Sequence, residues 1–95
     1  MNMIDWLQNW YKENCDGDWE HMFGIRIQSL DNPGWNVAID LLDTELEDKV
    51  FEKKKCYIND DNWISCFVKN GIFEGAGDAD KLEEILRTFK EWADS

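Results

Sequence analysis

Hydrophobic residues recur with a helical period at both ends of the chain. The N-terminal pattern predicts a helix over residues 1–15, with Asn2 as its candidate N-cap and Gly17 as its stop. The apolar face of this helix comprises Met3, Leu7, Trp10 and Tyr11. The C-terminal pattern predicts an amphipathic helix after Asp78, its candidate N-cap. The apolar face of that helix comprises Leu82, Ile85, Leu86, Phe89, Trp92 and Ala93.

Between the two helices the hydrophobic period changes to two, which is typical of β-strands. Residues 19–30 alternate in this way, and residues 35–41 do so again. Asparagine, proline and glycine at residues 32–34 predict a turn between them. We therefore expect an antiparallel hairpin, and matching its apolar faces requires an odd number of connecting residues. The apolar face of the first strand comprises Trp19, His21, Phe23, Ile25 and Ile27.

A second hairpin is predicted around Asn70 and Gly71, the strongest short hairpin signal in the chain. Residues 63–69 and 72–76 flank this turn as strands, and a two-residue turn places Lys69 opposite Ile72. One face of the pair then comprises Ile64, Cys66, Val68, Phe73 and Gly75, and the opposite face carries Trp63, Phe67 and Ile72. This part of the sheet therefore has apolar groups on both faces.

The remaining segments complete a single domain. Residues 43–49 form an acidic connection, and residues 50–58 are predicted to be an edge strand, because three lysines at 53–55 would oppose edge-to-edge pairing. Residues 59–62 form a turn. The order of helix, about five antiparallel strands and helix predicts a two-layer α+β domain over residues 1–95, with both helices on one sheet face.

Composition narrows the classes of partner. The chain has 95 residues, of which 43% are hydrophobic, and its 21 acidic against 10 basic residues give a net charge of −11. A phosphate backbone or an anionic lipid surface requires a basic protein surface, so we expect no nucleic-acid and no membrane partner. A basic protein partner is compatible with this charge. Neither a membrane-length apolar run nor a signal peptide is visible in the sequence.

Few residues suggest catalytic chemistry. The three cysteines, Cys15, Cys56 and Cys66, lack CxxC spacing and are interpreted as small buried thiols of a reducing compartment. The single histidine, His21, falls on an apolar strand face, which predicts a packed structural histidine. A general base, a metal ligand or one member of a Cys–His dyad are the alternatives for His21.

Two loops have superficial ligand-binding features. Asp16, Asp18 and Glu20 alternate as in an acidic cation-binding loop, but the full calcium-loop pattern is missing. Glycine, alanine and glycine at residues 75–77 precede a helix, but the segment lacks the lysine position and the length of a phosphate loop, and Asp78 would repel a phosphate. We therefore predict no catalytic residues, no cofactor and no metal site.

Several distinctive strings run through the chain. Cys-Asp-Gly-Asp-Trp-Glu-His occupies residues 15–21, and Leu-Asp-Asn-Pro-Gly-Trp occupies residues 30–35. Phe-Glu-Gly-Ala-Gly-Asp at residues 73–78 and Phe-Lys-Glu-Trp at residues 89–92 follow. In these strings the sequence resembles the immunity protein 53 family, and the resemblance covers almost the whole chain.

The resemblance implies a bacterial immunity protein of a polymorphic toxin system. Such a protein is small and cytoplasmic, and it binds a cognate toxin domain and neutralises it by occlusion, without catalysis. The acidic charge favours a basic nuclease as the toxin. Two alternatives are a metal- or small-ligand-binding domain using Asp16, Asp18 and His21, and a small thiol/His enzyme using His21, Glu20 and a cysteine.

Candidate toxin contacts combine acidic and aromatic residues. Glu20 and Asp40 belong to the less buried face of the first predicted hairpin, and Trp63 and Phe67 supply an aromatic anchor of the kind that interfaces favour. Residues 16–21 are compatible with a structural or a functional role. The candidate set comprises Asp16, Asp18, Glu20, Asp31, Asp40, Asp43, Glu45, Trp63 and Phe67.

Overall fold

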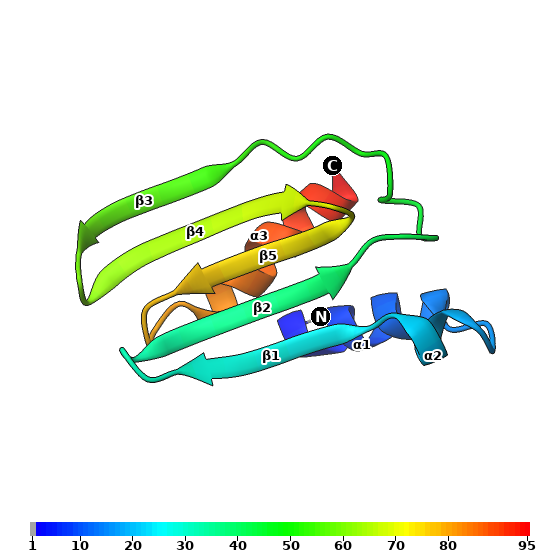
Figure 1. Cartoon of the computed structure of the whole chain (residues 1–95), viewed down its shortest axis with the longest axis horizontal. Coiled ribbons are helices and arrows are strands. Elements are labelled where there is room, and N and C mark those ends of the chain that lie inside the picture. The colour runs from blue at the N-terminus through cyan, green and yellow to red at the C-terminus, as the bar shows by residue number, and fades with distance from the viewer. Residues whose placement is uncertain (1) are drawn as a thin grey trace.

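The computed structural model describes residues 2–95. Its elements follow the order α1 (Met3–Asn14), α2 (Trp19–Met22), β1 (Ile25–Leu30), β2 (Gly34–Asp40), β3 (Lys54–Asn59), β4 (Asn62–Lys69), β5 (Ile72–Gly77) and α3 (Leu82–Asp94). The strands form one sheet in the order β1-β2-β5-β4-β3, and all neighbouring strands are antiparallel. β1 and β3 are therefore the two edges of the sheet (Figure 1).

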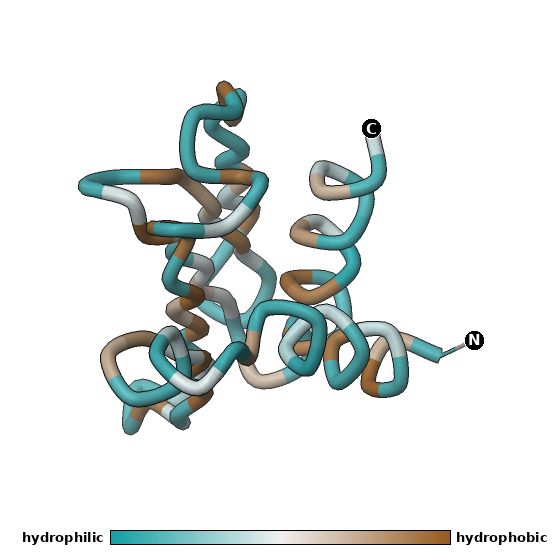
Figure 2. The backbone as a smooth tube through the Cα atoms, turned by 90° about the vertical axis from the view of Figure 1, so that its right-hand side faces the viewer, coloured by the Kyte–Doolittle hydropathy of each residue, from teal (hydrophilic) through white to brown (hydrophobic). Residues whose placement is uncertain are grey.

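The terminal helices lie on the same side of the sheet (Figures 1 and 2). α3 packs over β4 and β5, and α1 packs beside α3. Together they enclose one core, which comprises Leu7, Trp10, Trp19, Val37, Ile39, Leu41, Leu46, Ile64, Cys66, Phe73, Ile85, Leu86 and Phe89. The predicted α+β architecture is confirmed, with five strands and a helix near each end of the chain. Within residues 2–95 no helix covers the opposite face of the sheet.

The first helix begins where its sequence predicts. Asn2 is the N-cap of α1, because its Oδ1 atom accepts a hydrogen bond of 2.8 Å from the backbone N–H of Asp5. The helix ends at Asn14. Gly17 follows in the left-handed region at φ 96°, a conformation that glycine adopts without a steric penalty.

The prediction that Asp78 caps α3 is wrong. The helix begins at Leu82, with Lys81 at the cap position. The carboxylate of Asp78 instead accepts hydrogen bonds from the backbone N–H of Trp63 at 2.8 Å, from that of Asp80 at 2.9 Å and from Lys81 Nζ at 2.7 Å. Its hydrogen bond with Lys81 is the main reason that the pKa of Asp78 falls to about 2, while desolvation opposes the shift. Asp78 therefore fastens the loop between β5 and α3 to strand β4.

Both predicted hairpins are confirmed. Lys69 pairs with Ile72, and the turn residues Asn70 and Gly71 have φ values of 54° and 74°, as tight hairpin turns require. In the first hairpin Leu30 pairs with Gly34, so residues 31–33 form the connection, an odd number as expected. The apolar faces of β1 and β2 are consequently in register.

The prediction of one strand over residues 19–30 is wrong in its first half. Residues 19–22 form the short helix α2, and β1 begins only at Ile25. Trp19 is buried, with its Nε1–H donating to the carbonyl oxygen of Leu42 at 2.9 Å. A helical turn forms here instead of a strand, because Asp16 accepts the backbone N–H of Trp19 at the start of α2 and Glu20 accepts that of Gly17 in the preceding loop.

His21 consequently does not occupy the core. It is exposed on α2, so the predicted structural role among Trp19 and Phe23 is wrong for its side chain. The ring of Phe23 packs near that of Trp19, with centroids 6.2 Å apart, without requiring the histidine.

The lysine-rich segment is an edge strand, as predicted. β3 begins at Lys54 and pairs only with β4, whereas Val50 and Phe51 precede the strand.

The prediction of three buried thiols holds only for Cys66. Cys56 is exposed, Cys15 is half-buried, and all three cysteines are free.

Candidate functional site

The uncovered sheet face carries the two aromatic candidates. Trp63 and Phe67 are both half-buried and lie on the same side of β4, with Ser65 between them. Tyr57 of β3 pairs with Trp63 and is exposed, so a third ring joins this side of the sheet. Glu74 pairs with Phe67 and adds a carboxylate. The result is an aromatic surface interspersed with polar groups, which we call the open face.

Asp40 also lies on the open face, at the end of β2, and is only 7% exposed. Its Oδ2 atom accepts hydrogen bonds from Arg26 Nη1 at 3.0 Å and from the backbone N–H of Gly24 at 2.9 Å, and Arg26 Nη2 reaches Oδ1 at 3.3 Å. Burial raises the pKa of Asp40, but the Arg26 guanidinium and the Gly24 N–H outweigh it and the net shift is downward. The carboxylate therefore joins the start of β1 to the end of β2, and little of it is accessible to a partner.

The remaining acidic candidates lie at two opposite ends of the sheet. Most belong to the segment between α1 and β1, which includes α2, and to the loop after β2; the hydrogen bond of Trp19 to Leu42 joins the two (right-hand end of Figure 1). This group comprises Asp16, Asp18, Glu20, Asp43 and Glu45. Asp31 lies in the β1–β2 turn at the other end, where Pro33, Asp60, Asp61, Asp78 and Asp80 line one hollow of about 220 Å³. The structure thus brings five of the predicted acidic contacts to one end and separates them from Asp31.

Residues 16–21 are held together by reciprocal capping. Asp16 Oδ1 accepts the backbone N–H groups of Asp18 and Trp19 at 2.9 Å each, while the Glu20 carboxylate accepts those of Asp16 and Gly17 at 3.0 and 2.9 Å. The N–H groups of Trp19 and Asp18 lower the pKa of Asp16. The backbone N–H of Glu20 itself, followed by those of Asp16 and Gly17, lowers the pKa of Glu20. Both side chains build the loop and also keep their negative charge at neutral pH.

The other chemical candidates do not converge. Burial raises the pKa of the Cys66 thiol to about 11, so this thiol stays protonated beneath α3. His21 is exposed on α2. In the described chain, residues 2–95, no group of three or more histidine, cysteine or acidic side chains is arranged to hold a metal ion. Nor is any helix in this range long and apolar enough to cross a membrane.

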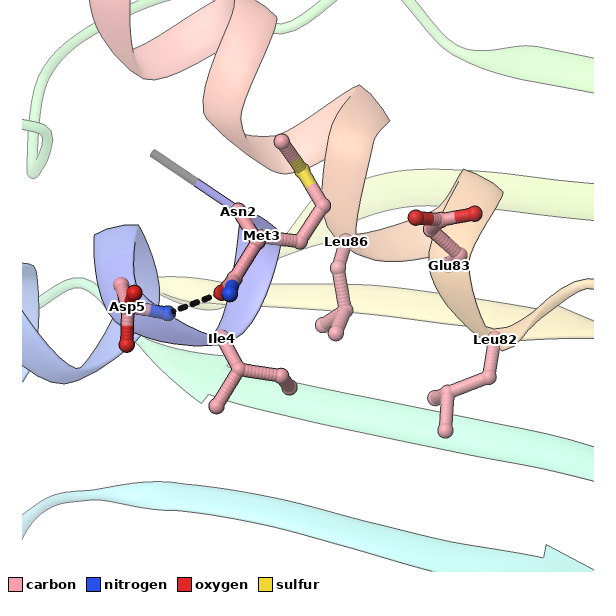
Figure 3. A pocket seen from close by; sticks show the side chains of 7 residues that line it. All are labelled: Asn2, Met3, Ile4, Asp5, Leu82, Glu83 and Leu86. Atoms are coloured by element: carbon pink, nitrogen blue, oxygen red, sulfur yellow. Dashed lines mark hydrogen bonds between the residues drawn. The ribbon is translucent and has the colours of Figure 1, made fainter.

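Two apolar hollows flank the start of α1, and sequence reasoning missed both. One, of about 400 Å³, lies between the first turns of α1 and α3, where Ile4, Leu82 and Leu86 line it (Figure 3). The other, of about 450 Å³, lies between α1 and β1. Ile4 lines both hollows and is 51% exposed. The sequence offered only an isoleucine three residues before Leu7, outside the apolar face assigned to the predicted helix.

These observations define a small acidic α+β domain with one bare sheet face and charged loops at both ends. The family model of Immunity protein 53 matches residues 4–94, nearly the whole chain. The protein therefore belongs to the immunity protein 53 family, whose members are immunity proteins of toxin systems. No curated protein and no solved structure matches the chain.

Proposed function

We propose that this protein binds a cognate toxin domain and neutralises it by covering the surface through which the toxin acts. The immunity protein itself catalyses no reaction in this proposal. Membership of the immunity protein 53 family carries the proposal. A toxin made in the same cell must be blocked in the compartment where it acts. We therefore place the protein in the bacterial cytoplasm, where its three free thiols would stay reduced.

The open face is the central contact surface in this proposal. Interfaces concentrate their binding energy in a few aromatic and arginine side chains that lose their remaining solvent on association. Trp63 and Phe67 are half-buried before binding, so their side chains are already ordered and still have apolar surface to bury. Glu74 pairs directly with Phe67 and offers an acceptor to a basic group beside the anchor.

The acidic ends are the steering surface. We propose that Asp18, Asp43 and Glu45, which are exposed, approach basic side chains of the toxin. Asp16 and Glu20 add negative charge at the same end, while Asp16 also accepts the N–H of Trp19 at the start of α2 and Glu20 accepts that of Gly17 in the preceding loop. Asp31 contributes at the opposite end, whereas Asp40 supports the sheet through Arg26 and makes no direct contact. A basic nuclease is the toxin class that this charge favours.

We expect a neighbouring gene to encode a toxin C-terminal domain, and the test is co-expression with that domain. We expect growth to be restored and a complex to co-purify. The double variant Trp63→Ala/Phe67→Ala should fold and lose most of the protection, because two anchors are removed from the interface centre. Arg87→Ala, on the exposed side of α3, is the matched surface control and should protect fully. A toxin that neither binds the wild-type protein nor is blocked by it would reject the proposed function.

A further inference from the structure

The two edges of the sheet are protected to different degrees. β3 is guarded by adjacent lysines and by a register shift between Tyr57 and Asn59, two features that oppose pairing with another strand. β1 has an unbroken register with β2. Its only charged residue is Arg26, whose guanidinium is bound by Asp40 on the open face. The β1 edge is therefore the one available for strand pairing.

The orientation of the free groups follows from one hydrogen bond. The backbone N–H of Asp40 donates to the carbonyl oxygen of Gly24 at 3.1 Å. In an antiparallel pair the bonded residues alternate, so Arg26, Gln28 and Leu30 direct their backbone groups toward β2. Residues 25, 27 and 29 direct theirs toward the unpaired edge.

An apolar groove adjoins this edge on the helix side of the sheet. It is the hollow of about 450 Å³ between α1 and β1, with Ile4, Leu7, Gln8 and Tyr11 on the helix and Ile25 and Ile27 on the strand. Ile27 is 41% exposed at its rim. None of the lining residues is charged, in a chain of which 33% of residues are charged.

Because the groove carries no charge, a second copy of this chain fits it better than a basic toxin does. A basic toxin is attracted to the acidic ends of the molecule and would gain no electrostatic benefit at the groove. A second copy of this chain presents the same uncharged surface, so the two surfaces meet without opposing like charges. The strand is also self-complementary: when Ile27 of each copy lies opposite Ile27 of the other, Arg26 faces Gln28 and not another arginine.

We propose that two copies of this protein associate through antiparallel pairing of their β1 strands, with the α1–β1 grooves closing on each other. The two-fold axis of such a pair stands perpendicular to the sheet, so both α1 helices lie on the same side and bury Ile4 and Ile27 between them. The strands continue as one sheet across the dimer. Trp63 and Phe67 remain uncovered, so each copy can still bind a toxin.

Self-association and toxin binding should respond to salt concentration in opposite directions. Two copies that each carry −11 repel one another, and screening at higher ionic strength weakens that repulsion. Self-association should therefore strengthen as salt rises. Binding to a basic toxin should weaken over the same range. Failure of one interaction can thus be distinguished from failure of the other.

Sedimentation velocity of the purified protein tests the proposal. Over about 1 to 300 µM, the wild type should pass from the 11.3 kDa monomer toward a species of twice that mass, and more completely at about 0.5 M than at about 0.05 M NaCl. Ile27→Lys should weaken dimerisation about tenfold or more, because two ammonium groups then meet at the axis. Ile58→Lys is the matched control, an isoleucine that is 64% exposed on the β3 edge, and should dimerise as the wild type does.

Hydrogen exchange on the wild type supplies a readout that needs no variant. The amides of Ile25, Ile27 and Ser29 should exchange more slowly as concentration rises, while those of β3 should not change. A wild-type protein that stays monomeric at every concentration and salt would overturn the proposal. So would a dimer that is lost in Ile58→Lys and kept in Ile27→Lys, or one in which the β1 amides gain no protection.

Discussion

Gly75 of β5 lies directly beneath Ile85 of α3. A Cβ atom built on Gly75 would overlap Cγ2 of Ile85 and would also crowd the ring of Phe73. The missing side chain lets α3 approach the centre of the sheet, where Ile85 and Phe73 are fully buried. The close approach thus fixes the spacing of the two layers.

Gly75→Ala should destabilise the protein by about 1 to 3 kcal/mol, the usual cost of overpacking a well-filled core. The control is Gly24→Ala, because a Cβ at Gly24 meets no atom within 4 Å and its φ is not positive. Urea denaturation of both variants measures the difference. Equal stability of the two variants would show that α3 moves away from the sheet without cost.

Trp19 and His21 lie two residues apart on α2, yet their replacement should have opposite outcomes. Trp19 is 3% exposed and donates to Leu42, so Trp19→Phe, which removes the donor and some volume, should cost about 1 to 3 kcal/mol. His21→Gln changes an exposed side chain and should alter stability by less than about 0.5 kcal/mol. Thermal melts compare the two variants. A large loss of stability in His21→Gln would restore the structural role that the sequence suggested.

Asp78 should make stability depend on pH in the acid range. Its pKa is about 2 in the folded protein against an ordinary value of 3.8, so the folded state favours the ionised form. That contribution is complete above about pH 4 and is lost as pH falls toward about 2. In Asp78→Asn this part of the pH dependence should disappear, and stability at pH 7 should be lower. Asp80→Asn on the same loop is the control, and denaturant titrations at several pH values compare all three proteins.

The sequence predicted those parts of the fold that rest on local chemistry. Asn70 and Gly71 supply the positive φ values of a tight turn, and Asn2 supplies a cap to the first helix, so both features followed from residue type alone. The segment around Trp19 did not follow, because a few alternating residues fit a strand and a short helix equally well. The signal that distinguishes them is Glu20, four residues after Asp16, which accepts the N–H groups of the preceding loop.

The site was less predictable because it depends on long-range pairing. The sequence correctly placed Trp63 and Phe67 on the face opposite Ile64, since alternation along one strand determines this. It could not show that Asp40 is engaged by Arg26, a residue on the neighbouring strand, or that Asp31 lies at the other end of the sheet from Asp43. Nor could it reveal the α1–β1 groove, because a groove exists only once the helix is docked beside the strand.

The negative charge at the end of the molecule that carries Asp18 and Glu45 (right-hand end of Figure 1) should control the rate at which a basic toxin associates. Asp18→Lys combined with Glu45→Lys reverses two exposed charges there and leaves the hydrogen bonds accepted by Asp16 and Glu20 in place. The association rate should fall by about tenfold at low salt and the difference should shrink above about 0.15 M, where the Debye length is about 8 Å. The dissociation rate should change less, because it reflects the desolvated contacts at the centre of the interface.

The matched control for this charge reversal is Glu52→Lys combined with Glu91→Lys. It makes the same change in net charge at exposed positions in the loop before β3 and on α3. If only the end that carries Asp18 and Glu45 steers the toxin, the control should slow association by no more than about twofold. Surface-binding kinetics across a salt series, with melting temperatures to verify folding, distinguish the two variants. Equal slowing by both would mean that net charge acts without regard to position. A wild-type association rate that ignores salt would remove electrostatic steering and leave Trp63 and Phe67 as the principal determinants of binding.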